Sequence, residues 1–429
     1  MLFKDSVSLI PKCFLVGDSL FRLSLCISTT PYALHKTRCP VFPSLSSLLD
    51  IHQVFVVKFL ESFFVSFINF CLGEMDLSLL GSEVDALPHL STNFIWPKEY
   101  LVDVQGQLQV PVVNLDGFLR EDEEATQYAA KLIREVCSNH GFFQVINHGV
   151  DSRLIREAHN QIDNFFKLPI RRKLSVPKTL ASMWGYSGAH AHRFSSKLPW
   201  KETLSFPYHD NTLEHVVTNY FKSNIGEDFE QAGVIFQKYC DGMKQLGLKL
   251  MELLAISLGV DRLHYRELFS DGCSIMRCNN YPSCHQPSLT LGTGPHCDPT
   301  SITILHQDLV GGLHVFADNK WKMVQPRLDA LVVNIGDTFT ALSNGRYKSC
   351  LHRAVVNKYK ERKSLAFFLC PKEDKVLRAP DSVVGMDGTK QYPDFTWSDL
   401  LHFTQKHYRA DQATLPNFIN WLLSSKTTN

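Results

Sequence analysis

Neither sign of charge is in excess in this sequence. Its 429 residues include 44 Lys and Arg and 43 Asp and Glu, and the formal net charge is only +1. Attraction to nucleic acid or to an anionic membrane through the field of the whole protein needs a clear basic surplus. We therefore expect neither partner, and we predict a monomer that acts on a small molecule.

Long apolar runs and paired cysteines are also lacking. The stretch 54–72 is interrupted by Lys58, Glu61 and Asn69, which disfavours a membrane span, and charges near the N-terminus interrupt any secretory signal. The 12 cysteines include no Cys-x-x-Cys pair, and a chain of this length needs no disulfide framework. We expect reduced thiols and a cytoplasmic protein.

The residues that are present divide the chain into four stretches. We expect residues 1–74 to be a poorly structured N-terminal extension that the native protein need not contain; a hydrophobic helix docked on the domain is the alternative. Residues 75–265 are predicted to form a region of helices and strands, and residues 376–429 a C-terminal helical segment. Between them, residues 266–375 hold short apolar runs separated by Gly, Asn, Asp and Pro, which favours antiparallel strands in a double-stranded β-helix, or jelly roll. The expected fold class is mainly β with flanking helices (α+β).

Local patterns predict several elements of this fold. Residues 109–115 are typical of a short strand, and a helix whose apolar face includes Tyr128 and Val136 follows and stops near Gly141, before another apolar strand. A second, longer helix is predicted to end at Gly259.

Three residues of the predicted core point to metal chemistry. His296 and Asp298 stand two apart in a strand-like run, so both side chains leave the same face of the chain. His352 follows after several predicted strands, which suits a return to the same end of a barrel. Two histidines and one carboxylate on one side of an octahedral metal leave three positions open, and this is the ligand set of non-haem iron(II) oxygenases. A zinc hydrolase with the same ligands is an alternative.

Arg362 and Ser364 share one face of another predicted strand. A guanidinium can hold a carboxylate through two parallel hydrogen bonds, and a hydroxyl beside it adds a third. The pair therefore predicts a dicarboxylate cosubstrate near the metal. Taken alone, Arg362 could also be an edge-strand arginine that pairs with a nearby glutamate.

Other histidines are expected to stay out of the metal site. His306 or His314 as a further ligand would crowd a centre that must remain open, so we predict that both belong to the pocket wall or the surface. His140 and His148 flank an apolar strand and are predicted to serve in turns or caps.

Over roughly residues 90–425, the sequence resembles the plant 2-oxoglutarate- and iron(II)-dependent dioxygenases. The resemblance is carried by the block His140-Gly-Phe-Phe-Gln-Val-Ile-Asn-His-Gly149 and by His296, Asp298, His352, Arg362 and Ser364. It implies that iron(II) is bound by the two histidines and the aspartate, and 2-oxoglutarate by the arginine and the serine. Dioxygen as substrate and ascorbate as activator are further implications.

The segment Asn279-Asn-Tyr-Pro-Ser-Cys284 matches the family's Asn-Tyr-Tyr-Pro-x-Cys sequence. The match implies that Tyr281 contributes to the 2-oxoglutarate pocket. Asn280 stands in place of the family's first tyrosine, and the sequence leaves open how this change affects the pocket wall.

A finer resemblance is to gibberellin 20-oxidases, over the segments 94–97, 198–203 and 291–307. It implies that Trp200 and Lys201 contact the substrate, an apolar diterpenoid acid. From the residues alone, the segment 198–203 is equally compatible with a surface loop.

The activity that this resemblance implies is the oxidation of carbon 20 of gibberellin precursors in successive steps, with the preferred precursor left open. Two alternatives remain. One is a related plant dioxygenase that acts on a flavonoid or on another position of a gibberellin, and the other is a jelly roll that binds the hormone without turning it over.

Overall fold

The computed structural model describes residues 90–178, 183–188, 197–209, 214–385, 388–407 and 413–426. The predicted extension over residues 1–74, together with the docked helix as its alternative, lies outside these residues. Within the described ranges, no helix combines the length and the apolar character that crossing a membrane requires.

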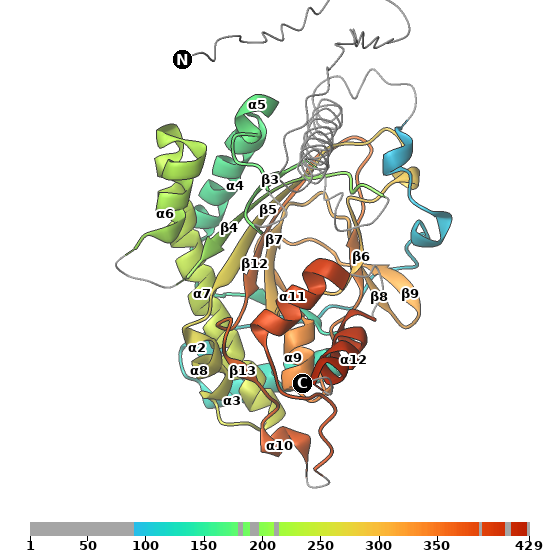
Figure 1. Ribbon diagram of the computed structural model, residues 1–429. Coiled ribbons are helices and arrows are strands. Elements are labelled where there is room, and N and C mark those ends of the chain that lie inside the picture. The colour runs from blue at the N-terminus through green and yellow to red at the C-terminus, as the bar shows by residue number, and fades with distance from the viewer. Residues whose placement is uncertain are drawn as a thin grey trace, which may run out of the picture. The chain divides into compact units, whose positions relative to one another are not determined.

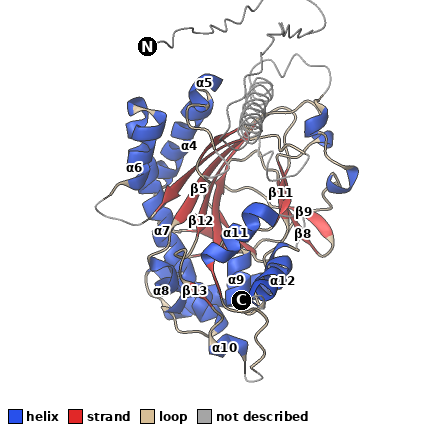
Figure 2. Cartoon of the chain, viewed as in Figure 1, coloured by secondary structure: helices blue, strands red, loops and turns tan. Residues whose placement is uncertain are grey.

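Two sheets form the centre of the described structure (Figures 1 and 2). The larger sheet has eight strands in the order β1-β2-β10-β7-β12-β5-β4-β3, and the smaller has four in the order β6-β11-β8-β9, counting described residues only. Strands β1 and β2 are parallel, and the other neighbours in the two sheets are antiparallel. The predicted jelly-roll core with flanking helices is therefore confirmed.

Each of the two sheets takes its strands from separate parts of the chain. The larger sheet consists of β1 (Val112–Asn114), β2 (Phe142–Ile146), β3 (Gly185–Ser187), β4 (Glu202–Tyr208), β5 (Ser274–Tyr281), β7 (Ile302–Gln307), β10 (Leu331–Ile335) and β12 (Arg362–Leu369). The smaller sheet consists of β6 (Thr293–His296), β8 (Leu313–Ala317), β9 (Lys320–Met323) and β11 (His352–Ala354). A separate pair is formed by β13 (Val376–Leu377) and β14 (Phe395–Thr396). Strands β1 to β4 come from the N-terminal region, and the division of the chain into domains stays a prediction.

The α-helices flank these sheets (Figure 2). Within the described ranges they are α2 (Asp116–Leu119), α3 (Glu123–Asn139), α4 (Ser152–Phe166), α5 (Ile170–Lys173), α6 (Val216–Tyr220), α7 (Glu230–Leu258), α8 (His264–Ser270), α9 (Asp337–Leu342), α10 (Asp381–Val384), α11 (Trp397–His407) and α12 (Thr414–Lys426).

Helix α7 supports the larger sheet from outside. A Cβ at Gly247 would lie 3.3 Å from Leu369 of β12 and 3.6 Å from Ile304 of β7, so the helix packs directly on these strands. Its end is as predicted, because Gly259 takes the left-handed conformation (φ 71°) that favours glycine after a helix.

Helix α3 and strand β2 form the predicted helix-to-strand unit. The side chain of Asp122 caps the helix by accepting a hydrogen bond from the backbone N–H of Ala125 at 3.0 Å. Gly141, at φ 68°, turns the chain into β2. Tyr128 was wrongly predicted to lie on the apolar face: its side chain is 64% exposed, whereas Val136 is buried. Tyr128 lies two four-residue steps before Val136, and because each such step advances about 40° beyond a full turn, the two side chains are roughly 80° apart and Tyr128 falls on the solvent side.

The register of the larger sheet arranges its inner face in four rows. Because alternate residues of a strand point to the same face, every second residue of β5, β7 and β12 faces the smaller sheet. From one end to the other, the rows contain Asn334, Thr303 and Phe368; then Leu305, Ala366 and Arg277; then Gln307, Ser364 and Asn279; and last Arg362 and Tyr281.

Candidate active site

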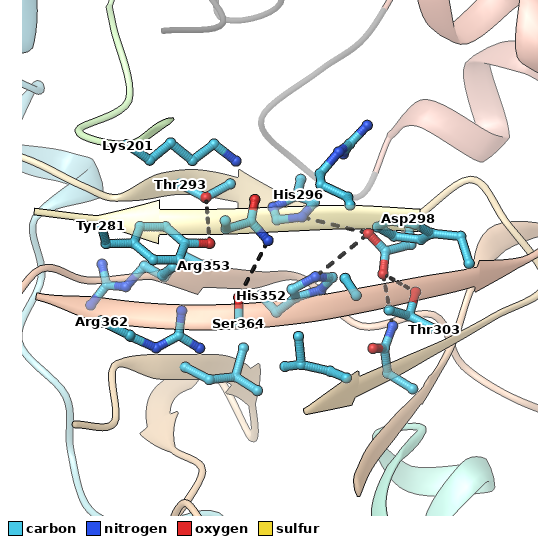
Figure 3. A pocket seen from close by; sticks show the side chains of 18 residues that line it. Lys201, Tyr281, Thr293, His296, Asp298, Thr303, His352, Arg353, Arg362 and Ser364 are labelled. Atoms are coloured by element: carbon cyan, nitrogen blue, oxygen red, sulfur yellow. Dashed lines mark hydrogen bonds and ion pairs between the residues drawn. The ribbon is translucent and has the colours of Figure 1, made fainter. Parts of the chain in front are cut away.

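A cavity lies between the two sheets (Figure 3). Its wall on one side comes from the inner rows of the larger sheet, and on the other side from β6, β8 and β11 of the smaller one. All residues predicted to bind metal or cosubstrate line this cavity, namely His296, Asp298, His352, Tyr281, Arg362 and Ser364.

Strand pairing brings the predicted metal ligands together. Strands β6 and β11 are antiparallel, and His352 stands directly opposite His296 in the register. The Nε2 atoms of His296 and His352 lie 3.5 Å and 3.6 Å from Oδ1 of Asp298. Among the described residues, this is the one group of three His, Cys, Asp or Glu side chains whose ligand atoms converge, all within 4.8 Å of one another.

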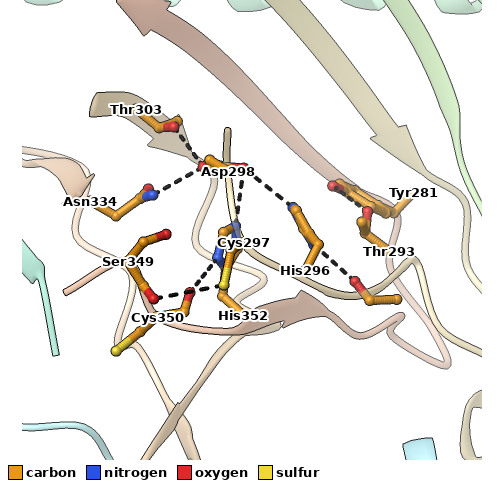
Figure 4. Close-up of polar contacts among 11 residues, drawn as sticks. Tyr281, Thr293, His296, Cys297, Asp298, Thr303, Asn334, Ser349, Cys350 and His352 are labelled. Atoms are coloured by element: carbon orange, nitrogen blue, oxygen red, sulfur yellow. Dashed lines mark hydrogen bonds and ion pairs between the residues drawn. The ribbon is translucent and has the colours of Figure 1, made fainter. Parts of the chain in front are cut away.

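The backbone fixes which ring nitrogen each histidine presents. Nδ1 of His296 lies 2.9 Å from the carbonyl oxygen of Gly294, and Nδ1 of His352 lies 3.1 Å from that of Cys350 (Figure 4). A carbonyl oxygen only accepts, so each Nδ1 carries the proton and each Nε2 keeps its lone pair. Both lone pairs are thereby available to a metal ion.

The Asp298 carboxylate is held by two donors from the larger sheet. Its Oδ2 accepts hydrogen bonds from Thr303 Oγ1 at 2.6 Å and Asn334 Nδ2 at 3.0 Å, which leaves Oδ1 directed at the histidines. Burial raises the pKa of this carboxyl, but His352, His296 and the two hydrogen bonds outweigh burial and bring the pKa to about 2. The group is therefore an anion over the physiological pH range, as a metal ligand must be.

These ligands fit iron(II) with open coordination positions. Two imidazole nitrogens and one carboxylate oxygen converge from one side, and the cavity lies on the other. Gly294 of β6 allows the ring of Trp96 to pack against this strand, because a Cβ at that position would overlap the ring.

Replacing Thr303 by valine is expected to weaken iron(II) binding roughly 10- to 100-fold, since the loss of a hydrogen bond to a ligating carboxylate has effects of this size. Titration of the metal-free protein with iron(II) under anaerobic conditions measures the change. Thr404→Val, the same replacement at a buried threonine of α11, is the matched control and should bind iron(II) as the unmodified chain does. Equal affinities in both variants would contradict the role of Thr303.

Arg362 forms an anion site at the far row of the cavity. Its side chain is 2% exposed and its Nη2 donates to Gln307 Oε1 at 2.8 Å, but Nε and Nη1 have no hydrogen-bond partner among the described residues. Buried charged donors without an acceptor are costly, so this position needs an anion. A carboxylate that accepts two parallel hydrogen bonds from one edge of the guanidinium would meet that need.

Tyr281 and Ser364 complete this site. The guanidinium carbon of Arg362 lies 4.9 Å from the centre of the Tyr281 ring, a cation–π contact that fixes the plane of the guanidinium. Ser364 Oγ accepts a hydrogen bond from Asn279 Nδ2 at 3.3 Å, so its own proton can be directed to a bound carboxylate.

The two residues predicted to contact substrate lie in different places. Lys201 lines the cavity (Figure 3), and its Nζ lies 6.0 Å from the centre of the Tyr281 ring, which Arg362 also contacts. Trp200 is not among the lining residues. Its ring packs against Phe94 at 5.1 Å between centres, and its Nε1 donates to the carbonyl oxygen of Pro282 at 3.2 Å. The structure brings Lys201 to the cavity and places Trp200 behind its wall.

Asn280 points away from the cavity, because it leaves the opposite face of β5 from Tyr281. Its Nδ2 donates to Glu202 Oε2 at 3.3 Å, and Oε1 of the same buried carboxylate accepts from Lys173 at 2.6 Å and from Tyr186 at 2.5 Å. The replacement of the family's tyrosine therefore affects the contact between β4 and β5 behind the site.

The remaining histidines lie outside the metal site. His140 and His148 accept hydrogen bonds through Nδ1 from the backbone two residues further on, which confirms their roles in turns. His306 and His314 are neither exposed nor lining residues: both are buried, His306 against His159 and His314 beside Arg353. Their placement in the wall or at the surface was wrong because both strands are covered on the side to which these residues point.

Several residues of the site escaped the sequence analysis, among them Thr303, Asn334, Gln307 and Arg277. Thr303 and Asn334 are polar residues with apolar neighbours on both sides, and that interruption was the available signal. Their inward direction depends on the register of β7 and β10.

Comparisons with known proteins agree with this geometry. Residues 272–371 match the model of the 2OG-Fe(II) oxygenase superfamily, and residues 110–224 match that of the non-haem dioxygenase in morphine synthesis N-terminal region. The chain is 54% identical over 337 residues to gibberellin 20 oxidase 2 of Oryza sativa subsp. indica, which covers 78% of this chain and 86% of the relative. It is 50% identical over 353 residues to gibberellin 20 oxidase 1-A of Triticum aestivum, which covers 82% of this chain and 95% of the relative.

Solved structures show the same fold. JOX2 in complex with 2OG, Fe and JA superimposes with a TM-score of 0.69 at 30% identity, over 80% of this chain and 96% of that one. AtDAO1 from Arabidopsis thaliana, in a complex with 2-oxoglutarate, gives a TM-score of 0.55 at 26% identity, over 65% of this chain and 99% of that one. With the converging triad and the buried arginine, these similarities establish that the chain belongs to the 2OG-Fe(II) oxygenase superfamily and is a 2-oxoglutarate- and iron(II)-dependent dioxygenase.

Proposed function

We propose that this dioxygenase oxidises carbon 20 of gibberellin precursors in successive steps. The observation that carries the proposal is its 54% identity to a gibberellin 20 oxidase over 337 residues. That similarity covers 86% of the relative's own length, so it extends over most of the enzyme.

In this proposal, His296, Asp298 and His352 hold iron(II), while Arg362, Ser364 and Tyr281 hold 2-oxoglutarate. When bound, iron and cosubstrate supply the oxidising chemistry, in which decarboxylation of 2-oxoglutarate to succinate is coupled to the use of O2 and to oxidation of the substrate.

The residues of the chain contribute binding, orientation and the exclusion of water. Nε2 of each histidine and Oδ1 of Asp298 face one side of the metal position, so the cavity side stays available to cosubstrate and O2. Arg362 aligns the cosubstrate along the inner face of the larger sheet, and the buried strands around it keep solvent from the reacting atoms.

Lys201 has a different role here from the substrate contact that the sequence predicts. It lies beside Tyr281, which Arg362 also contacts, so we assign its charge to the cosubstrate end of the cavity. Trp200 supports that end from behind by holding the Pro282 carbonyl group.

We further propose that the enzyme works as a monomer in the cytoplasm, without nucleic acid or a membrane as partner. The balance of 44 basic and 43 acidic residues supports the absence of a polyanionic partner. Eight cysteines of the described residues are free thiols, which supports a reducing compartment.

The test is an incubation of the protein with iron(II), 2-oxoglutarate, ascorbate and a panel of twenty-carbon gibberellin precursors, read by mass spectrometry. We expect the alcohol and aldehyde at carbon 20 and then a nineteen-carbon product, with succinate formed at each step. Oxidation of a flavonoid or of another ring position would replace this proposal by a related activity. Binding of the hormone without release of succinate would identify a non-catalytic receptor.

A further inference from the structure

The cavity is rich in positive charge. Four of its described lining residues are cationic, namely Lys201, Arg277, Arg353 and Arg362, and Asp298 is the only acidic residue among them. Three of the four have a role already. Arg362 and Lys201 belong to the cosubstrate end, and Arg353 donates to the carbonyl oxygens of Tyr100 and Val102 and stacks 4.2 Å from the centre of the Trp321 ring. Arg277 is the fourth cationic residue, and neither metal binding nor cosubstrate binding gives it a role.

Arg277 is held in a fixed orientation on the inner face of β5. Its Nε donates to Ser205 Oγ of β4 at 3.1 Å, and its guanidinium carbon lies 5.3 Å from the centre of the Phe368 ring of β12. A planar guanidinium that is bonded on one edge and stacked on a ring is preorganised to bind a carboxylate.

The register separates Arg277 from the cosubstrate end. Arg277 and Tyr281 are four residues apart on one strand, so their Cα atoms are roughly 13 Å apart. Arg362 pairs with Tyr281 across the sheet, and Arg277 pairs with Ala366. A carboxylate at Arg277 is therefore a different one from the carboxylate at Arg362.

Arg277 also lies to one side of the metal ligands. The Asp298 carboxylate is bonded to Thr303 of β7, and β5 is separated from β7 by the intervening β12. Two strand spacings amount to roughly 10 Å. The floor between these points consists of Leu305, Ala366 and Phe368, so it is apolar, and Ala366 leaves room above the middle strand.

An apolar floor with an arginine at its far edge fits an apolar ring system that carries a carboxylate. We propose that Arg277 binds a carboxylate of the substrate across this floor and thereby makes the enzyme selective for carbocyclic acids over their neutral esters. The choice of a carbocyclic acid rests on the proposed function, and the position of the anion site rests on the geometry of β4, β5 and β12.

The test compares a twenty-carbon gibberellin precursor acid with the ester that blocks its ring-borne carboxylates. The unmodified enzyme is expected to favour the free acid in kcat/KM by roughly 10- to 100-fold, which corresponds to one charge-assisted hydrogen bond more for the acid than for the ester. In Arg277→Gln this preference should fall close to one, mainly through a higher KM for the acid. Arg277→Lys keeps the charge and should restore part of the preference.

Lys201→Gln is the matched control, since it removes a cation from the opposite end of the same cavity. It should keep the preference for the acid and change the apparent affinity for 2-oxoglutarate. Acid and ester used equally well by the unmodified enzyme would overturn the proposal, and so would a preference lost in Lys201→Gln but kept in Arg277→Gln.

A binding measurement keeps this test separate from the proposed function and from folding. A tricyclic diterpenoid acid and its methyl ester are titrated anaerobically into protein loaded with iron(II) and 2-oxoglutarate. Tighter binding of the acid, lost in Arg277→Gln, would support the anion site even if no gibberellin precursor were oxidised. Should Arg277→Gln fail to fold, Ser205→Ala removes only the orienting bond and should lower the acid preference several-fold; an unchanged preference there would count against the proposal.

Discussion

His296→Ala is expected to abolish substrate-dependent succinate formation while leaving the fold intact. The change removes one of three ligand atoms that converge within 4.8 Å, and the side chain lies at the edge of the cavity rather than in the packed core. The loss of a hydrogen bond behind a ligand already weakens metal binding about 10- to 100-fold, so the loss of a ligand should cost more. Iron(II) titration and succinate release measure the effect, and circular dichroism checks the fold.

His314→Gln is the matched control for this experiment. His314 is buried on β8, next to β11 that carries His352, but it does not line the cavity. This variant should keep its affinity for iron(II). Full activity in His296→Ala, or loss of iron binding in His314→Gln, would show that the metal lies elsewhere.

Arg362→Ala is expected to weaken 2-oxoglutarate binding by about 100- to 10,000-fold. The change removes the two charge-assisted hydrogen bonds that one edge of the guanidinium can donate to a carboxylate, each worth about 1.5–3 kcal/mol. Arg362→Lys keeps the charge but lacks the planar fork, so it should fall between the unmodified chain and the alanine variant. Calorimetric titration of the iron-loaded protein with 2-oxoglutarate measures all three.

Lys363→Ala serves as the control on the same strand. Lys363 points to the other face of β12, where it pairs with Asp163 and Glu361. Its removal should leave the affinity for 2-oxoglutarate unchanged. If Lys363→Ala lowered the affinity for 2-oxoglutarate as much as Arg362→Ala does, the effect would come from a disturbed strand and not from the loss of the guanidinium.

Much of the fold was predictable because it depends on local periodicity. The alternation of short apolar runs predicts the jelly roll, and the helical spacing before Gly259 predicts α7. Periodicity was less informative for single positions. It assigned Tyr128 to the core face, although this residue is 64% exposed. The helical repeat shows which residues lie near one another on the helix surface, but it does not show how wide the strip is that neighbouring elements cover.

For the candidate site, too, the features that depend on local sequence pattern could be predicted. The spacing of His296 and Asp298, and of Arg362 and Ser364, determines by itself that each pair shares a face, because the side chains of a strand alternate with a period of two. These residue types also determine the chemistry, an open metal site and a carboxylate clamp.

Only the tertiary structure decided which strands lie side by side. The pairing of β6 with β11 places His352 opposite His296, and the order β7-β12-β5-β4 sets Arg277 apart from Arg362. The structure also places Lys201 at the cosubstrate end of the cavity and Trp200 behind the cavity wall, whereas the sequence predicted that both contact the substrate. Strand order and register arise from contacts between segments far apart in the chain, and the local sequence pattern of one strand does not specify its neighbours.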